Sequence, residues 1–126
     1  MATDGAIRRM RDFNKLHAFR LADELVIQVH HLTRSFPANE RLAFTHQLRT
    51  AALSVPSNIV EGCSRHSERD FLRFLDIAYA SCREVQYQLS LARRLELANP
   101  ALVKPVELKS EETSKELAAL IKALRR

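Results

Sequence analysis

The fold is decided by the stretch FLRFLDIAYASCREVQYQLSLA, residues 71–92 of the 126-residue chain. Its apolar residues step alternately by four and three positions along the whole stretch: Phe71, Leu75, Ala78, Cys82, Val85, Leu89 and Ala92. A seam with this period is typical of a long helix that packs along its length against other helices. Ser67, with Asp70 three residues later, predicts an N-cap, so we expect a helix from about Ser67 to Leu97.

Apolar residues at helical spacing predict two more helices before this one. The first runs from about Leu16 to Ser35 and ends at Phe36-Pro37, because the residue before proline is disfavoured in helical geometry. The second follows Asn39, a candidate N-cap, and reaches Gly62, where we expect the chain to leave the helix. The apolar residues of these two helices are Ala22, Leu25, Val29, Leu32, Phe36, Leu42, Leu48, Ala52, Val55 and Ile59.

A fourth helix is predicted after Asn99-Pro100, since proline suits the first position of a helix. Residues 107–115 are strongly polar, and we expect this middle part to face solvent or to fray. The apolar residues of the helix are Leu102, Val106, Leu117, Leu120, Ile121 and Leu124.

The second predicted helix contains Pro56, which removes one backbone donor and crowds the carbonyl four residues back. We therefore expect a kink near Leu53–Val55, or two shorter helices at an angle. Four amphipathic helices with short connections favour an all-α fold, an antiparallel up-down four-helix bundle with a kinked second helix. The bundle is expected to span residues 13–126, and residues 1–12 are expected to form a flexible basic arm.

The composition excludes several classes of protein. With 46% hydrophobic and 28% charged residues, the chain is typical of one packed domain. It has no apolar run of signal-peptide or membrane-spanning length, so we expect a cytoplasmic protein. The chain contains no Glu-x-x-His pair, phosphate-binding loop or hydrolase motif, so we expect no metal, no cofactor and no enzymatic activity. A nucleophile formed by Cys63 and His66 is a minor alternative.

The stretch QLRTAALSVPSNIVEG, residues 47–62, closely resembles the signature of the 23S ribosomal RNA intervening-sequence proteins. The resemblance covers roughly residues 13–97. Further matching residues are Leu16, Phe19, Ala22, Leu32, Thr33, Phe36, Pro37, Arg65, Ser67, Phe71, Phe74, Leu75, Ala78, Ser81, Glu84, Gln88 and Leu89.

This resemblance implies an antiparallel four-helix bundle that often assembles as a ring-like homopentamer and has no settled biochemical activity. Genes of this family lie inside intervening sequences of bacterial large-subunit ribosomal RNA and elsewhere in bacterial genomes. A related branch, the accessory variability proteins of diversity-generating retroelements, binds a reverse transcriptase and nucleic acid. Two basic positions of the family pattern are absent, because Thr50 and Tyr79 stand there, so weaker contacts with RNA are expected.

The motif residues favour a structural role over a catalytic one. Asn58 can bond backbone groups freed by Pro56, and Glu61 can pair with Arg65 one helical turn later. Gly62 and, on the following helix, Glu84 complete the set of family-motif residues to which we assign structural roles.

The formal charge of +5 favours contact with nucleic acid or with acidic protein surfaces. Acidic residues alternate with Arg69 and Arg73, so a solvated, self-compensated helix face is the competing interpretation. The candidate nucleic-acid contacts are Arg8, Arg9, Arg11, Arg49, Arg65, Arg69, Arg73, Arg93 and Arg94.

Two functional hypotheses follow. The leading one is a homo-oligomeric, nucleic-acid-associated binding module, with RNA as the expected partner and a pentamer as the expected assembly. The alternative is a protein-interaction scaffold or accessory subunit, for example of a retroelement reverse transcriptase, whose charge only steers the encounter.

Overall fold

The computed structural model describes residues 11–38 and 42–125. Within these ranges a short 3₁₀ turn and long α-helices follow one another: η1 (Phe13–Lys15), α2 (His17–Thr33), α3 (Leu42–Cys63), α4 (Glu68–Arg94) and α5 (Pro100–Leu124). The prediction of an all-α four-helix bundle is confirmed. The predicted N-cap Asn39 lies outside the described residues.

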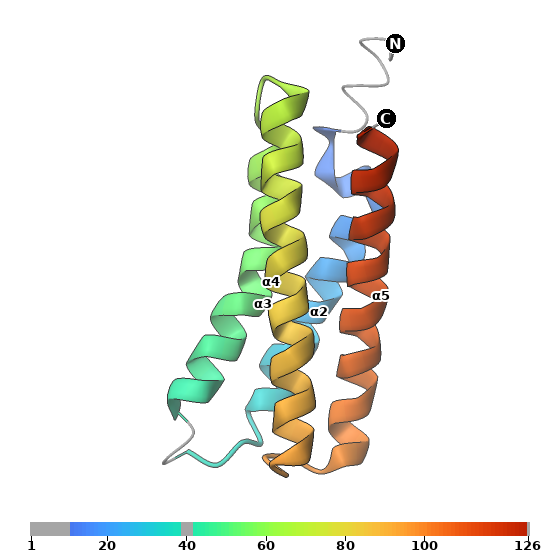
Figure 1. Cartoon of the computed structure of the whole chain (residues 1–126). Helices are drawn as coiled ribbons and strands as arrows, with labels where there is room; N and C mark the ends of the chain where they lie inside the picture. Colours follow the sequence, from blue (N-terminus) through green and yellow to red (C-terminus); the bar gives the residue numbers. More distant parts are fainter. Residues whose placement is uncertain (1–10, 39–41, 126) are drawn as a thin grey trace.

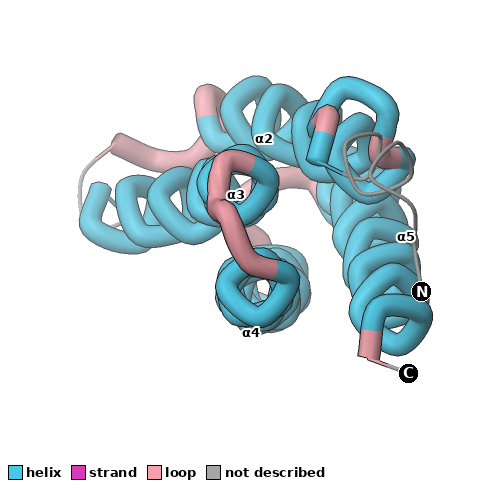
Figure 2. Tube along the Cα trace, turned by 90° about the horizontal axis from the view of Figure 1, so that it is seen from above, coloured by secondary structure: helices cyan, strands magenta, loops and turns pink. Residues whose placement is uncertain are grey.

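The helices are arranged so that each packs against two neighbours. α2 and α4 lie diagonally opposite, and both contact α3 and α5. Figure 1 shows the end of α2, the start of α3, the end of α4 and the start of α5 at one end of the bundle. Figure 2, seen from above, shows the short connection from α3 to α4 at the other end.

The heptad seam of α4 forms the centre of the core. All of its residues are buried, from Phe71 to Ala92, as predicted. The helix ends at Arg94, three residues before the predicted end, because Glu96 adopts a left-handed φ of 56°. The N–H of Glu96 donates to the carbonyl of Arg93 at 3.1 Å, and the N–H of Leu97 donates to that of Ala92 at 3.0 Å. This pair of bonds is a Schellman motif, which closes a helix end.

Pro56 lies within one continuous helix, α3, so the alternative of two separate helices is wrong. Figure 1 shows the first half of α3 standing away from α4 and its second half lying along it. A kink at Leu53–Val55 stays a prediction. Gly62 is also helical and does not take a positive φ, which corrects the expectation that the helix ends there.

The expectation for α5 was wrong in two respects. Leu102 is 57% exposed, and its neighbour Val103 occupies the core instead. The polar middle of the helix is largely buried, with Glu107, Ser110, Thr113 and Ser114 inside the bundle. The hydroxyl groups are satisfied within their own helix: the side chains of Ser110, Thr113 and Ser114 donate to the carbonyls of Glu107, Lys109 and Glu111. Small side chains bonded in this way can face a neighbouring helix without losing hydrogen bonds.

Candidate nucleic-acid interface

Three of the candidate arginines lie around the short connection between α3 and α4. The guanidinium carbons of Arg65 and Arg73 lie 4.6 Å and 4.5 Å from the ring centroid of Phe74. Both are within cation–π distance, so one aromatic ring holds two positive charges in place. The connection itself is fixed by Ser67, whose hydroxyl accepts the N–H of Asp70 at 3.1 Å.

The charges of two of these arginines are partly neutralised by nearby carboxylates. Arg65 pairs with Glu61 one turn earlier, as the sequence predicted, and Arg73 pairs with Asp70 at 3.7 Å. Arg69 differs, because it is exposed and has no ion pair within the described part of the chain. Arg69 therefore presents the freest charge of the three to solvent.

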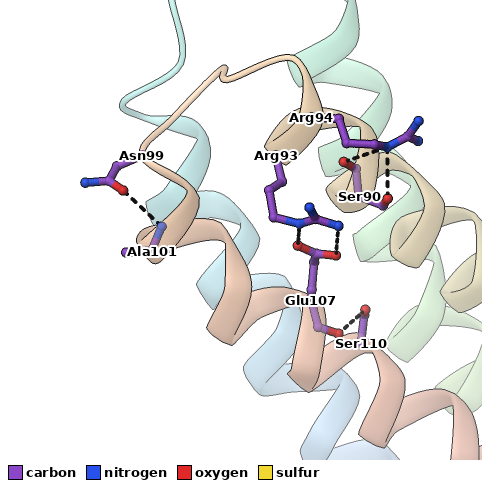
Figure 3. A network of polar contacts seen from close by, with 7 residues as sticks. All are labelled: Ser90, Arg93, Arg94, Asn99, Ala101, Glu107 and Ser110. Atoms are coloured by element: carbon purple, nitrogen blue, oxygen red, sulfur yellow. Dashed lines mark hydrogen bonds and ion pairs between the residues drawn. The ribbon is translucent and has the colours of Figure 1, made fainter.

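Two more candidates, Arg93 and Arg94, lie at the end of α4, and both form hydrogen bonds within the chain (Figure 3). Nε of Arg93 lies 2.6 Å from Oε1 of Glu107 on α5, whose side chain is only 8% exposed. The contact raises the pKa of Arg93 above its ordinary value, first through the hydrogen bond and then through the negative charge of Glu107. Arg94 donates to the carbonyl and the hydroxyl of Ser90 on its own helix.

Arg49 lies at the crossing of α2 and α3, away from the other candidates. Its Nε donates to the hydroxyl of Thr33 at 2.7 Å, and Thr33 is buried. Two basic residues at the end of α2, His30 and Arg34, lie near Arg49, since the charges of both arginines lower the pKa of His30. Neither His30 nor Arg34 was among the contacts predicted from the sequence. The signal that could have found them is a run without carboxylates, because residues 25–38 and 42–60 contain no Asp or Glu.

The remaining candidates belong to the N-terminal arm. Arg11 is half-buried, next to the turn η1. Arg8 and Arg9 lie outside the described residues. The structure therefore divides the described candidates between the two ends of the bundle and does not bring them together in one patch.

Motif residues of α3 form hydrogen bonds within the bundle. Nδ2 of Asn58 donates to the carbonyl of Ser54 at 2.7 Å and to its hydroxyl at 2.9 Å. The carbonyl that Pro56 leaves without a helical donor is that of Ala52, so Asn58 does not bond the group that the sequence suggested. Ser54 also bonds Ser81 of α4 at 2.8 Å, and this contact links the motif to the next helix.

Gly62 lets α3 and α4 approach closely. A Cβ added there would lie 3.0 Å from Cβ of Phe74 and 3.3 Å from the backbone oxygen of Phe71. Neither atom is the movable end of a flexible side chain, so a larger residue would push the helices apart. Glu84, the last motif residue, is exposed and accepts a hydrogen bond from Nε2 of Gln88 at 3.2 Å.

A groove between the first half of α3 and the middle of α4 gathers several residues of the family motif. It is open and mixed in polarity, and it is lined by Ala43, His46, Gln47, Thr50, Ala51, Ser54, Ser81 and Glu84. The same two helices also carry exposed apolar side chains. Leu53 of α3 is 57% exposed, and Ile77 and Tyr87 of α4 are 39% and 60% exposed.

The two cysteines are poorly suited to nucleophilic chemistry. Burial raises the pKa of the Cys63 thiol to about 11 and that of the Cys82 thiol to about 12. A catalytic cysteine needs a lowered pKa, so the pairing of Cys63 with His66 gains no support. Among residues 11–38 and 42–125, no group of three or more His, Cys, Asp or Glu side chains is placed to hold a metal ion. No helix in these ranges is long and apolar enough to cross a membrane.

The fold and the surface together define a small helical-bundle protein with basic side chains at both ends. Residues 14–119 match the family described as 23S rRNA-intervening sequence protein, and the chain belongs to this family. A solved structure of a protein of unknown function from the S23 ribosomal protein family of Bacteroides thetaiotaomicron is similar to this chain, with 26% identity and a TM-score of 0.76. The similarity covers 83% of this chain and 98% of that one. No curated protein matches the chain.

Proposed function

We propose that the protein is a non-enzymatic, RNA-associated bundle that acts as a homo-oligomer and contacts RNA mainly through phosphate groups. The description of its family associates these proteins with intervening sequences of 23S rRNA. The formal charge of +5 favours a polyanionic partner. Most aromatic rings pack against the core or against each other, so stacking on bases contributes little.

The observation that carries this proposal is the set of arginines without a carboxylate partner. Arg34, Arg49 and Arg69 form no ion pair within the described residues, although they are exposed or half-buried. Arg93 differs, because its charge is already matched by that of Glu107. Guanidinium groups left without a partner can bind phosphate oxygens, because their fork of N–H donors matches that geometry.

Self-association would multiply this modest charge. The exposed apolar residues Ile77 and Tyr87 lie on a second stripe of α4 that also contains Ala80 and Glu84, spaced by three and four positions. Glu84 of this stripe also lines the α3–α4 groove, so the stripe and the groove together offer one face for contact with another copy. A ring would repeat the basic groups around its axis and strengthen binding through multivalency. A pentamer is the assembly we expect first.

The test combines molar mass with nucleic-acid content. The protein is purified without nuclease, and light scattering and the ratio of absorbance at the nucleic-acid and protein maxima are measured on the same peak. We expect a mass above that of a dimer of the 14.4 kDa chain, with nucleic acid bound at low salt. Affinity for single-stranded RNA should fall with salt by about 0.7 log units per log unit for each phosphate contact.

The same apolar stripe supports a second candidate function, a scaffold for a protein partner. A protein that stays free of nucleic acid and does not bind RNA even at low salt would favour this scaffold. Binding that is tight but insensitive to salt would also contradict phosphate contact as the main source of affinity.

A further inference from the structure

One corner of the bundle combines arginine and histidine side chains from two helical segments whose described residues include no carboxylate. The C-terminal part of α2 carries His30, His31 and Arg34, and the facing part of α3 carries Arg49. The segments 25–38 and 42–60 contain no Asp or Glu. Figure 1 shows that the end of α2 and the start of α3 lie at the same end of the bundle. The two helices pack against each other, and the positive charges of Arg49 and Arg34 both act on His30.

Arg49 is held in place by neutral groups instead of a carboxylate. Its Nε donates to Oγ1 of Thr33 at 2.7 Å, and the Thr33 hydroxyl lies 2.8 Å from the carbonyl oxygen of Val29, to which it donates. Thr33 is only 3% exposed, so the anchor is rigid. The terminal amino groups of Arg49 have no hydrogen-bond partner within the described part of the chain, and they carry its charge at the surface of the corner.

The pKa of His30 is affected by the charges of this corner. The pKa of its imidazole lies below the ordinary value, first because of the positive charge of Arg49, then because of desolvation and the charges of Arg34 and His31. α5 places Lys109 against α2, but there it pairs with Glu24. Basic side chains are favourable near the C-terminus of a helix, and this effect can explain why His31 and Arg34 lie at the end of α2. It does not account for Arg49, which belongs to another helix.

We propose that this α2–α3 corner, formed by His30, Arg34 and Arg49, is a binding site for a phosphodiester group of RNA, and that binding there takes up a proton on His30. This inference rests on the proposed function and names the surface that performs it. The terminal amino groups of Arg49 donate to the phosphate oxygens, Arg34 supplies a second charge, and protonated His30 donates a further hydrogen bond. The arginines at the other end of the bundle contribute less, because Arg65 and Arg73 already have carboxylate partners. Arg69 has no ion pair among the described residues, but it is flanked in sequence by Glu68 and Asp70.

The proton coupling has a definite sign. Without ligand, the neighbouring cations disfavour the imidazolium form of His30. A bound phosphate brings negative charge and favours that form, so the pKa of His30 rises in the complex. Binding therefore takes up a proton, and affinity for RNA increases as the pH falls from the pKa of His30 in the complex to its lower pKa in the free protein.

The test measures binding of a fluorescein-labelled single-stranded RNA of arbitrary sequence by fluorescence anisotropy, at several salt concentrations. Loss of one phosphate contact lowers the salt slope by about 0.7, which is a loss of about fivefold in affinity at ~0.1 M salt. We expect this loss for Arg49→Gln and for Arg34→Gln. Arg125→Gln, which removes an exposed arginine that already pairs with Asp76, is the matched control and should change affinity less than about twofold. Arg34 has no side-chain bond within the described residues, so Arg34→Gln tests the site even if Arg49→Gln unfolds the protein.

The histidine is tested separately with His30→Ala and, as control, His66→Ala at the opposite end of the bundle. His30→Ala should remove most of the pH dependence of RNA affinity, whereas His66→Ala should retain it. NMR titration of the imidazole should show that the pKa of His30 rises when the RNA is added. If Arg34→Gln and Arg49→Gln leave RNA binding unchanged while Arg69→Gln abolishes it, the α2–α3 corner is not the binding site. That result would leave the proposed function standing. Absence of wild-type binding at low salt would overturn both.

Discussion

Arg93 of α4 and Glu107 of α5 form a two-point ion pair across the bundle, with Nε–Oε1 and Nη2–Oε2 distances of 2.6 Å and 3.4 Å. The carboxylate side is nearly buried and the guanidinium side is partly exposed. Removal of the arginine alone would leave a buried charge without a partner. This arrangement makes the pair a sensitive point for stability.

We expect Arg93→Met to lower the free energy of unfolding, but by less than the loss of one partner from a fully buried pair, because water still reaches the arginine side. The double substitution Arg93→Met with Glu107→Leu should be less harmful than Arg93→Met alone, since it removes the orphaned charge. Urea unfolding of the two single variants and the double variant gives the coupling energy. Additive losses in the double variant would show that the two groups do not interact.

The seam of α4 gives a second prediction. Phe71→Ala and Leu75→Ala should each lower the free energy of unfolding by about 2–5 kcal/mol, because both side chains are almost fully buried and their loss opens a cavity. Glu61→Gln is the comparison variant. Its ion pair with Arg65 is largely exposed, so its loss should lower stability by no more than about 1 kcal/mol. Thermal melts in which Glu61→Gln is the most damaging change would contradict the assigned core.

Gly62→Ala should destabilise the protein by about 1–3 kcal/mol, although alanine is the better helix former. The added methyl group would meet Cβ of Phe74 at 3.0 Å, and that atom cannot move without its helix. Ser57→Ala, at an exposed position of the same helix, should change stability by less than about 0.5 kcal/mol. If Gly62→Ala melts at a higher temperature than the wild type, helix propensity outweighs the close contact.

Glu96→Gly should stabilise the protein by about 0.5–1 kcal/mol, because Glu96 has a φ of 56°, which a side chain disfavours. Glu96→Ala keeps a Cβ and should bring no such gain. Chemical unfolding of both variants separates relief of backbone strain from loss of the glutamate charge. Equal stabilisation by the two substitutions would assign the effect to charge.

Much of the fold could be predicted because the apolar residues recur along the sequence at the spacing of a helix. The seam of α4 and the core residues of α2 follow this rule without exception. α5 does not, because its buried stripe contains Glu107, Ser110 and Thr113, which read as surface residues. Their burial depends on a salt bridge from α4 and on bonds to the helix backbone, and neither is visible in a hydropathy pattern.

The candidate site was less predictable than the fold. The sequence shows which residues are basic, but it does not show which of them already have a carboxylate partner. Arg93 is committed to Glu107, whereas Arg49 meets a neutral hydroxyl sixteen positions away in sequence. The role of His30 emerges only when α2 and α3 are packed together, because the charge that affects it most comes from α3.

The two thiols have a practical consequence for experiments on this protein. Cys63 and Cys82 are buried, and their raised pKa values leave almost no thiolate at neutral pH. A thiol reagent such as a disulfide dye can therefore react only as fast as the bundle opens. The rate of colour formation then measures the rate at which the bundle opens. The natural cysteines can therefore be used to follow exchange between the closed and the open molecule. A single cysteine introduced on the surface could carry a fluorophore while the natural pair stays unlabelled.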